Sequence, residues 1–152
     1  IPCFADDSGI CIEALNWQPG VLSKRFLNKF NSNEACFESI IKSTKKNGKK
    51  IAYFKTSICL TIKKGQNIVF NGQINGKISD QTRGEFGFGY DPIFIPKFYK
   101  KTLAELNTKE KNEISHRSIA VKKLINFLSN WSQMSYHCLS LIYSNLFQSY
   151  CF

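Results

Sequence analysis

Apolar and polar positions along the middle of the chain predict a β-meander. Residues 51–62 are rich in β-branched and aromatic side chains and predict a long strand. Turn residues at 63–67 predict a hairpin whose second strand begins at 68–70. Asn71-Gly72 predicts a further turn, and 73–78 a third strand. The meander leads the chain toward a glycine-rich loop.

Three other segments predict helices. Residues 32–46 carry apolar side chains at helical spacing, and Asn31 lies three residues before Glu34 in a loose capping-box arrangement. Thr102 predicts the start of a short helix, with Glu105 completing a capping box and with leucines turned inward. Ser115 is the expected N-cap of a last helix. Its buried stripe is expected to comprise Ile119, Ala120, Leu124, Phe127 and Leu128.

The chain opens with a short apolar strand at 1–5 that runs into Asp6-Asp7-Ser8-Gly9. Carboxylates at a strand end, followed by glycine, are a common way to present ligands to a divalent cation. If the strand continued, the two adjacent carboxylates would point to opposite faces, so one would face a site and the other would support the turn. An Asx-turn that closes a hairpin is the alternative.

Residues 84–94 alternate glycines with aromatic residues and then exit through Asp91-Pro92. Glycine allows backbone N–H groups to approach a ligand closely, and the aromatic side chains offer flat faces for a ring. This combination favours a loop that holds a planar ligand with polar edges, such as a nucleobase. A glycine-rich turn with core aromatics is the alternative interpretation.

Composition narrows the class of protein. The 152 residues fit one domain, and 43% hydrophobic with 21% charged residues is typical of globular chains. The net charge of +10 favours a polyanionic partner, either nucleic acid or a phosphate-rich small molecule. The sequence shows no secretory signal and no apolar run of membrane-spanning length, so we expect a cytoplasmic protein with no membrane partner. The six cysteines lack metal-ligand spacing, so we expect reduced thiols and no zinc.

Five separated signatures occur in one order: 5–9, 19–20, 70–72 with Gly76 and Ile78, 87–92, and a last group made of 104–106, 110–112 and 115–117. This series closely resembles the inosine/xanthosine triphosphatase family of purine nucleoside triphosphate pyrophosphatases. The resemblance covers about 1–129 and is specific, because five separated signatures agree. It does not extend to 130–152, an atypical tail without Asp, Glu, Lys or Arg.

The resemblance implies an α/β fold in which an elongated mixed central β-sheet has flanking helices and two lobes surround a nucleotide cleft. It also implies a homodimer. The implied reaction is Mg²⁺-dependent hydrolysis of ITP, dITP or XTP to the monophosphate and pyrophosphate, which cleanses the nucleotide pool.

The resemblance also implies roles for individual residues. Asp7 would be the general base and a metal ligand. The substrate contacts would be Ser8, Phe88, Gly89, Tyr90, Asp91, Lys111, His116 and Arg117. A base would stack on Phe88 or Tyr90. Arg117 has only donors, so it would pair with the 6-oxo group of hypoxanthine and oppose the 6-amino group of adenine.

The chain departs from the family pattern at its front. It begins at Ile1, after the first strand, the phosphate-binding loop and the helix with a Glu metal ligand that the family carries. We therefore expect a family member in which this first βα segment is missing and whose activity is low or absent. A basic module that binds nucleic acid is the alternative, although the scattered lysines make nucleic acid an unlikely partner.

Overall fold

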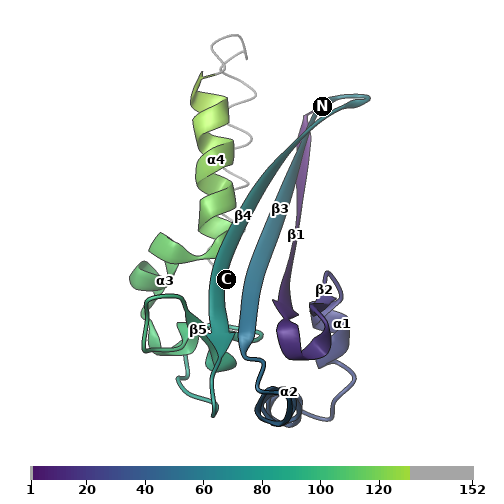
Figure 1. Ribbon diagram of the computed structural model, residues 1–152. Helices are drawn as coiled ribbons and strands as arrows, with labels where there is room; N and C mark the ends of the chain where they lie inside the picture. Colours follow the sequence, from purple (N-terminus) through teal and green to yellow (C-terminus); the bar gives the residue numbers. More distant parts are fainter. Residues whose placement is uncertain (1, 131–152) are drawn as a thin grey trace.

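The computed structural model describes residues 2–130, which form a five-stranded sheet with helices around it (Figure 1). The strands lie in the order β2-β1-β3-β4-β5. Their bounds are β1 (Cys3–Ile12), β2 (Gln18–Gly20), β3 (Ile51–Lys63), β4 (Gln66–Ile78) and β5 (Phe94–Pro96). The helices are α1 (Ser23–Leu27), α2 (Asn33–Asn47), α3 (Thr108–Ile114) and α4 (His116–Asn130), with short 3₁₀ turns at Glu13–Leu15, Asp91–Ile93 and Leu103–Glu105.

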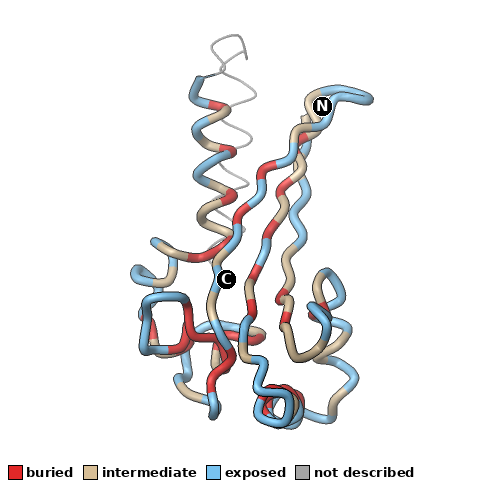
Figure 2. Tube along the Cα trace, viewed as in Figure 1, coloured by how far each residue is buried: buried red, intermediate tan, exposed pale blue. Residues whose placement is uncertain are grey.

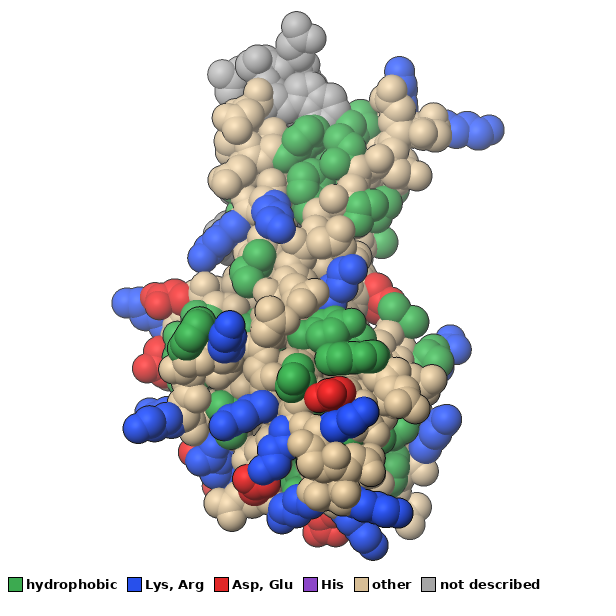
Figure 3. Space-filling view, in the orientation of Figure 1, with side chains coloured by type: hydrophobic (Ala, Val, Ile, Leu, Met, Phe, Trp, Pro, Cys, Tyr) green, Lys and Arg blue, Asp and Glu red, His purple; other side chains and the backbone are tan. Residues whose placement is uncertain are grey.

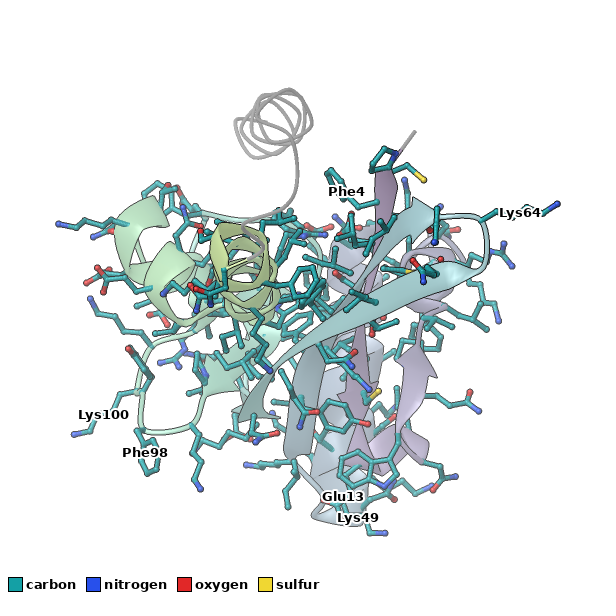
Figure 4. All side chains as sticks on the ribbon, turned by 90° about the horizontal axis from the view of Figure 1, so that it is seen from above. Phe4, Glu13, Lys49, Lys64, Phe98 and Lys100 are labelled. Carbon is teal, nitrogen blue, oxygen red and sulfur yellow. The ribbon has the colours of Figure 1, made fainter. Side chains whose placement is uncertain are left out.

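The α/β fold is confirmed, but the described strand pairings differ from the mixed sheet that we expected. All four pairings, β1 with β2, β1 with β3, β3 with β4 and β4 with β5, are antiparallel. A parallel pair would require a crossover connection, whereas β3 and β4 are joined by a tight hairpin. Lys64 lies at the tip of this hairpin and points away from the body (Figure 4).

The long strands bury one face and expose the other. Along β3 the even-numbered residues from Ala52 to Leu60 are buried, and the odd-numbered ones are exposed or half-buried, which is visible as alternating colours in Figure 2. Helix α4 covers one end of the buried face, while α2 and the segment around β5 cover the other (Figure 1).

Two hydrophobic clusters result, one at each end of the long strands. The first contains Phe37 of α2 and Phe54 of β3, and the second contains Ile58 of β3 and Leu124 of α4. The boundary between the two clusters lies at Thr56, between Phe54 and Ile58, and we refer to it as the joint.

Two turns expected from the sequence are absent because strands pass through them. β1 continues through residues 6–9 and pairs with β3 along its whole length, which excludes the Asx-turn. β4 continues through Asn71-Gly72, with Gly72 opposite Thr56. A Cβ on Gly72 would collide with the backbone oxygen of His116, so this glycine serves the close approach of α4 to the sheet and does not form a turn.

The helix predictions are largely confirmed. The cap of α2 is Ser32, whose hydroxyl accepts a hydrogen bond from Ala35 N at 3.2 Å, and not Asn31. The capping box of Thr102 and Glu105 is present. Ser115 caps α4, because its Oγ accepts a hydrogen bond from Ser118 N at 3.1 Å.

Three further expectations concern the tail, the cysteines and membrane-spanning segments. The tail lies outside the described residues, as do Cys138 and Cys151. The four described cysteines, Cys3, Cys11, Cys36 and Cys59, are free thiols. Within residues 2–130, no helix is long and apolar enough to cross a membrane.

Candidate functional site

Polar side chains gather at the joint between the two hydrophobic clusters. Thr56 is fully buried there, between Phe54 and Ile58 on the covered face of β3. Its hydroxyl lies 2.7 Å from Ser8 Oγ on β1. The first turn of α4 reaches the same place because Gly72 carries no side chain. Three elements, β1, β3 and α4, therefore meet at a polar point in an apolar face.

Because β1 continues through residues 6–9, its two carboxylates point to opposite faces of the sheet. Asp6 and Ser8 share the covered face and contact Arg117 of α4. Asp6 Oδ2 accepts hydrogen bonds from Arg117 Nε at 3.3 Å and from Nη2 at 3.2 Å, and Ser8 Oγ lies 3.3 Å from Nη2. Of the two adjacent carboxylates, the one on the covered face is Asp6.

Asp7 lies on the other face of β1, opposite Ser57 of β3. Its side chain is exposed, and its Oδ1 accepts a hydrogen bond from Ser8 N at 2.9 Å. The structure therefore does not bring Asp7 into contact with Arg117. In the described part of the chain, residues 3–9 of β1 pair with β3 only. The other edge of this segment has no neighbouring strand among the described residues.

The glycine-rich loop is built around the buried carboxylate of Asp91. Asp91 Oδ2 accepts hydrogen bonds from Phe88 N at 2.8 Å and from Lys111 Nζ at 2.5 Å. Burial raises the pKa of Asp91, and the Lys111 ammonium and the Phe88 N–H oppose that rise. Gly87 has a positive φ of 88°, and a Cβ there would collide with Asp91 Oδ2, so this glycine lets the loop close on its own carboxylate.

Phe88 is presented to solvent at the edge of this arrangement. It is 64% exposed. Lys111 Nζ lies 4.3 Å and Arg117 Cζ 5.8 Å from the centre of its ring. Such contacts between cations and an aromatic face are favourable. An exposed flat ring flanked by two donors that carry positive charge suits a planar ligand with acceptor oxygens.

Tyr90 does not offer a second stacking face, contrary to our expectation. It is buried against Phe37, and its hydroxyl donates a hydrogen bond of 2.7 Å to the backbone oxygen of Ser23. Ser23 Oγ in turn accepts a hydrogen bond from Ile10 N at 2.9 Å, just beyond residues 6–9. Tyr90 therefore anchors the loop to β1 and α1. Gly89, with φ 60°, has open space at its Cβ position.

His116 is buried at the N-terminus of α4 and stacks on Phe54, with ring centres 4.8 Å apart. Burial, together with the charges of Arg117 and Lys111, lowers the pKa of His116 to about 4, so the ring is neutral at physiological pH. Its Nδ1 is buried without a hydrogen-bond partner among the described residues. The ring is therefore packed at the joint with one nitrogen unpaired among the described residues.

A divalent cation would find few ligands on the described residues. No group of three His, Cys, Asp or Glu side chains within residues 2–130 is close enough to hold a metal ion. Asp6 is engaged by Arg117, whereas Asp7 is exposed. Mg²⁺ is often held by one or two carboxylates with substrate phosphates and water, and a single free carboxylate fits that mode.

Sequence reasoning assigned no role to three residues at or beside the joint: Thr56, Ser23 and Asp6, which it named only as one of two candidate carboxylates. Two of them carried a signal. Thr56 is a polar residue at an inward position of an alternating strand, and Asp6 shares a face with Ser8 once the strand is continued. For Ser23 the sequence offers no such signal, since its role depends on contacts with Tyr90 and Ile10.

Comparison with known proteins agrees with this architecture. The model of the Ham1 family matches residues 1–127. A "dITP/XTP pyrophosphatase" of Christiangramia forsetii is 42% identical over 127 residues, which are 84% of this chain and 66% of that protein. One from Bacillus subtilis is 40% identical over 127 residues, 82% of this chain and 64% of that protein. The chain thus spans just under two thirds of the length of these relatives.

Solved structures give the same result. The Ham1 protein of Staphylococcus aureus superimposes with a TM-score of 0.77 at 38% identity, over 84% of this chain and 67% of that one. A HAM1 protein from Coxiella burnetii gives a TM-score of 0.78 at 35% identity, over 85% of this chain and 68% of that one. The motif order, the fold and these likenesses together show that the chain belongs to the Ham1 family.

Proposed function

We propose that the protein carrying this chain hydrolyses purine nucleoside triphosphates with a 6-oxo group, ITP, dITP or XTP, to the monophosphate and pyrophosphate. The observation that carries the proposal is the pairing of exposed Phe88 with two flanking cations at the joint. The names of the dITP/XTP pyrophosphatases similar to this chain support the same substrate class.

The base would stack on Phe88. Stacking of a base on an aromatic side chain contributes about 1–3 kcal/mol and is tolerant of base identity. Selectivity would then come from Arg117, which has only donors and therefore donates a hydrogen bond to a 6-oxo group but not to a 6-amino group. Neutral His116 and Lys111 would complete the contacts. The excess of Lys and Arg on the surface, which Figure 3 shows spread over the visible face, suits a triphosphate substrate.

Asp7 would act as the general base that orients and deprotonates the attacking water. Its carboxylate is exposed and lies one residue from Ser8, which contacts Arg117 of the proposed base site. General-base assistance typically contributes about 10²–10⁴-fold to the rate. Asp7 would also hold Mg²⁺ together with the substrate; when bound, the ion neutralises charge on the phosphate oxygens.

The remaining features of the proposal concern context. The protein would work in the cytoplasm as a homodimer, with no nucleic-acid partner, and its role would be to cleanse the nucleotide pool. No observation on the described residues favours the alternative of a nucleic-acid-binding module.

The test is pyrophosphate release from ITP, XTP, ATP and GTP by the full-length protein that carries this chain, in the presence of Mg²⁺. We expect hydrolysis of ITP and XTP in preference to ATP and GTP, and a loss of at least about 100-fold in Asp7→Asn with an unchanged melting temperature. Asp80→Asn, which alters an exposed carboxylate paired with Lys50, is the matched control. Wild-type rates in Asp7→Asn would refute the role of Asp7 as base.

A further inference from the structure

Asp6 is the carboxylate that fixes the Arg117 side chain. Both Nε and Nη2 of Arg117 donate to the same oxygen, Asp6 Oδ2, at 3.3 and 3.2 Å. Ser8 Oγ lies 3.3 Å from Nη2 and is itself held by buried Thr56. Arginine has many rotamers, so contacts along one edge of the guanidinium determine where the other edge points.

The remaining edge of Arg117 is free for a ligand. Among the described residues, no hydrogen bond uses Nη1 of Arg117. The Arg117 side chain is 30% exposed, and its guanidinium carbon lies 5.8 Å from the centre of the Phe88 ring. A planar ligand stacked on Phe88 therefore has its edge near donors whose direction Asp6 sets.

Charge strengthens the dependence on Asp6. Arg117 and Lys111 both lie over Phe88, and like charges this close repel one another. Lys111 is neutralised by Asp91, and Arg117 by Asp6. Without Asp6, Arg117 would lose its ion pair, and only Ser8 would hold the guanidinium in place.

We propose that Asp6 is a specificity-positioning residue, which acts through Arg117 to make the site select purines with a 6-oxo group over those with a 6-amino group. This inference rests on the proposed function, because it assumes that the base lies on Phe88. Asp6 itself does not touch the substrate. Its loss should therefore affect the discrimination between bases more than the binding of any one triphosphate.

The experiment measures the affinities of the 152-residue chain for ITP and ATP by calorimetry in EDTA, where hydrolysis does not interfere. We expect Asp6→Ala to lower the ratio of ITP to ATP affinity by about tenfold, the effect of losing one charge-assisted hydrogen bond. Asp6→Asn, which keeps the shape and one acceptor oxygen, should lower it less. Asp80→Ala, which removes the exposed carboxylate paired with Lys50, should leave the ratio unchanged.

Three results would overturn the inference. The ratio could stay unchanged in Asp6→Ala while Arg117→Ala lowers it, which would show that Arg117 discriminates without Asp6. Alternatively, Asp6→Ala and Asp6→Asn could weaken ITP and ATP equally, which would show a merely structural role. Equal affinities for ITP and ATP in the wild-type chain would overturn both the inference and the proposed function, whereas the first two results would overturn the inference about Asp6 alone.

Discussion

The loop at 84–94 and the β1 segment at 6–9 border the same joint but enclose their carboxylates differently. The Asp91 side chain is 4% exposed and accepts hydrogen bonds from Phe88 N in its own loop and from Lys111 of the neighbouring helix α3. The Asp6 side chain is 38% exposed, and its cation comes from a distant helix. The loop carboxylate is thus enclosed by its hydrogen bonds, whereas Asp7 on β1 is exposed. Recognition of the base and hydrolysis of the phosphate should therefore be separable by mutation.

The largest loss of stability should come from removing the charge of the buried Asp91 carboxylate. Asp91→Asn leaves the largely buried Lys111 ammonium without its counter-charge, and loss of one partner from a buried pair costs about 3–5 kcal/mol. Asp80→Asn breaks an exposed pair and should cost less than about 1 kcal/mol. Urea unfolding of both variants measures the difference, and equal losses would show that the loop does not depend on its buried pair.

Low pH should destabilise the folded protein because His116 becomes protonated. The pKa of His116 is about 4 in the folded protein and near 6.5 when unfolded, so protonation favours the unfolded state. Stability from the neutral ring is full above pH 6.5 and is lost as the pH falls toward 4. Relative to His116→Gln, the wild type should lose roughly 2.5 kcal/mol between pH 7.5 and 4.5 in urea unfolding. Parallel pH curves for the two proteins would contradict the low pKa.

The smallest of these effects should come from the exposed ring. Phe88→Ala should weaken the binding of ITP and ATP alike by about 1–3 kcal/mol, because stacking does not depend on the base. Phe86 is 66% exposed in the same loop but has no cation over its ring among the described contacts. Phe86→Ala is therefore the control, and equal losses in the two variants would remove Phe88 from the base site.

The sequence predicted the long strand, the α2 and α4 helices and the glycine-rich loop because their patterns are local. Alternating residues from Ala52 to Leu60 and the capping residues Thr102 and Ser115 determine their elements with little help from the rest of the chain. The same local rules failed at Asn71-Gly72, where turn chemistry was outweighed by pairing with β3 and by the approach of α4.

The sequence suggested residues of a candidate site but could not predict how their side chains are arranged. The motifs named Phe88, Lys111 and Arg117, whose side chains lie in contact, yet they could not show that Tyr90 is buried. Nor could it show that Asp6 and Asp7 divide between two faces, because this depends on whether β1 continues through residues 6–9. Long-range pairing with β3 decided that question.

The central claim is that Phe88 and Arg117 form a base site selective for the 6-oxo group. Calorimetric titration of the wild-type chain with ITP and with ATP in EDTA tests it most directly. The account predicts that ITP binds at least about tenfold more tightly, because adenine would place a donor against the donors of Arg117. Equal affinity for the two nucleotides, or tighter binding of ATP, would contradict it.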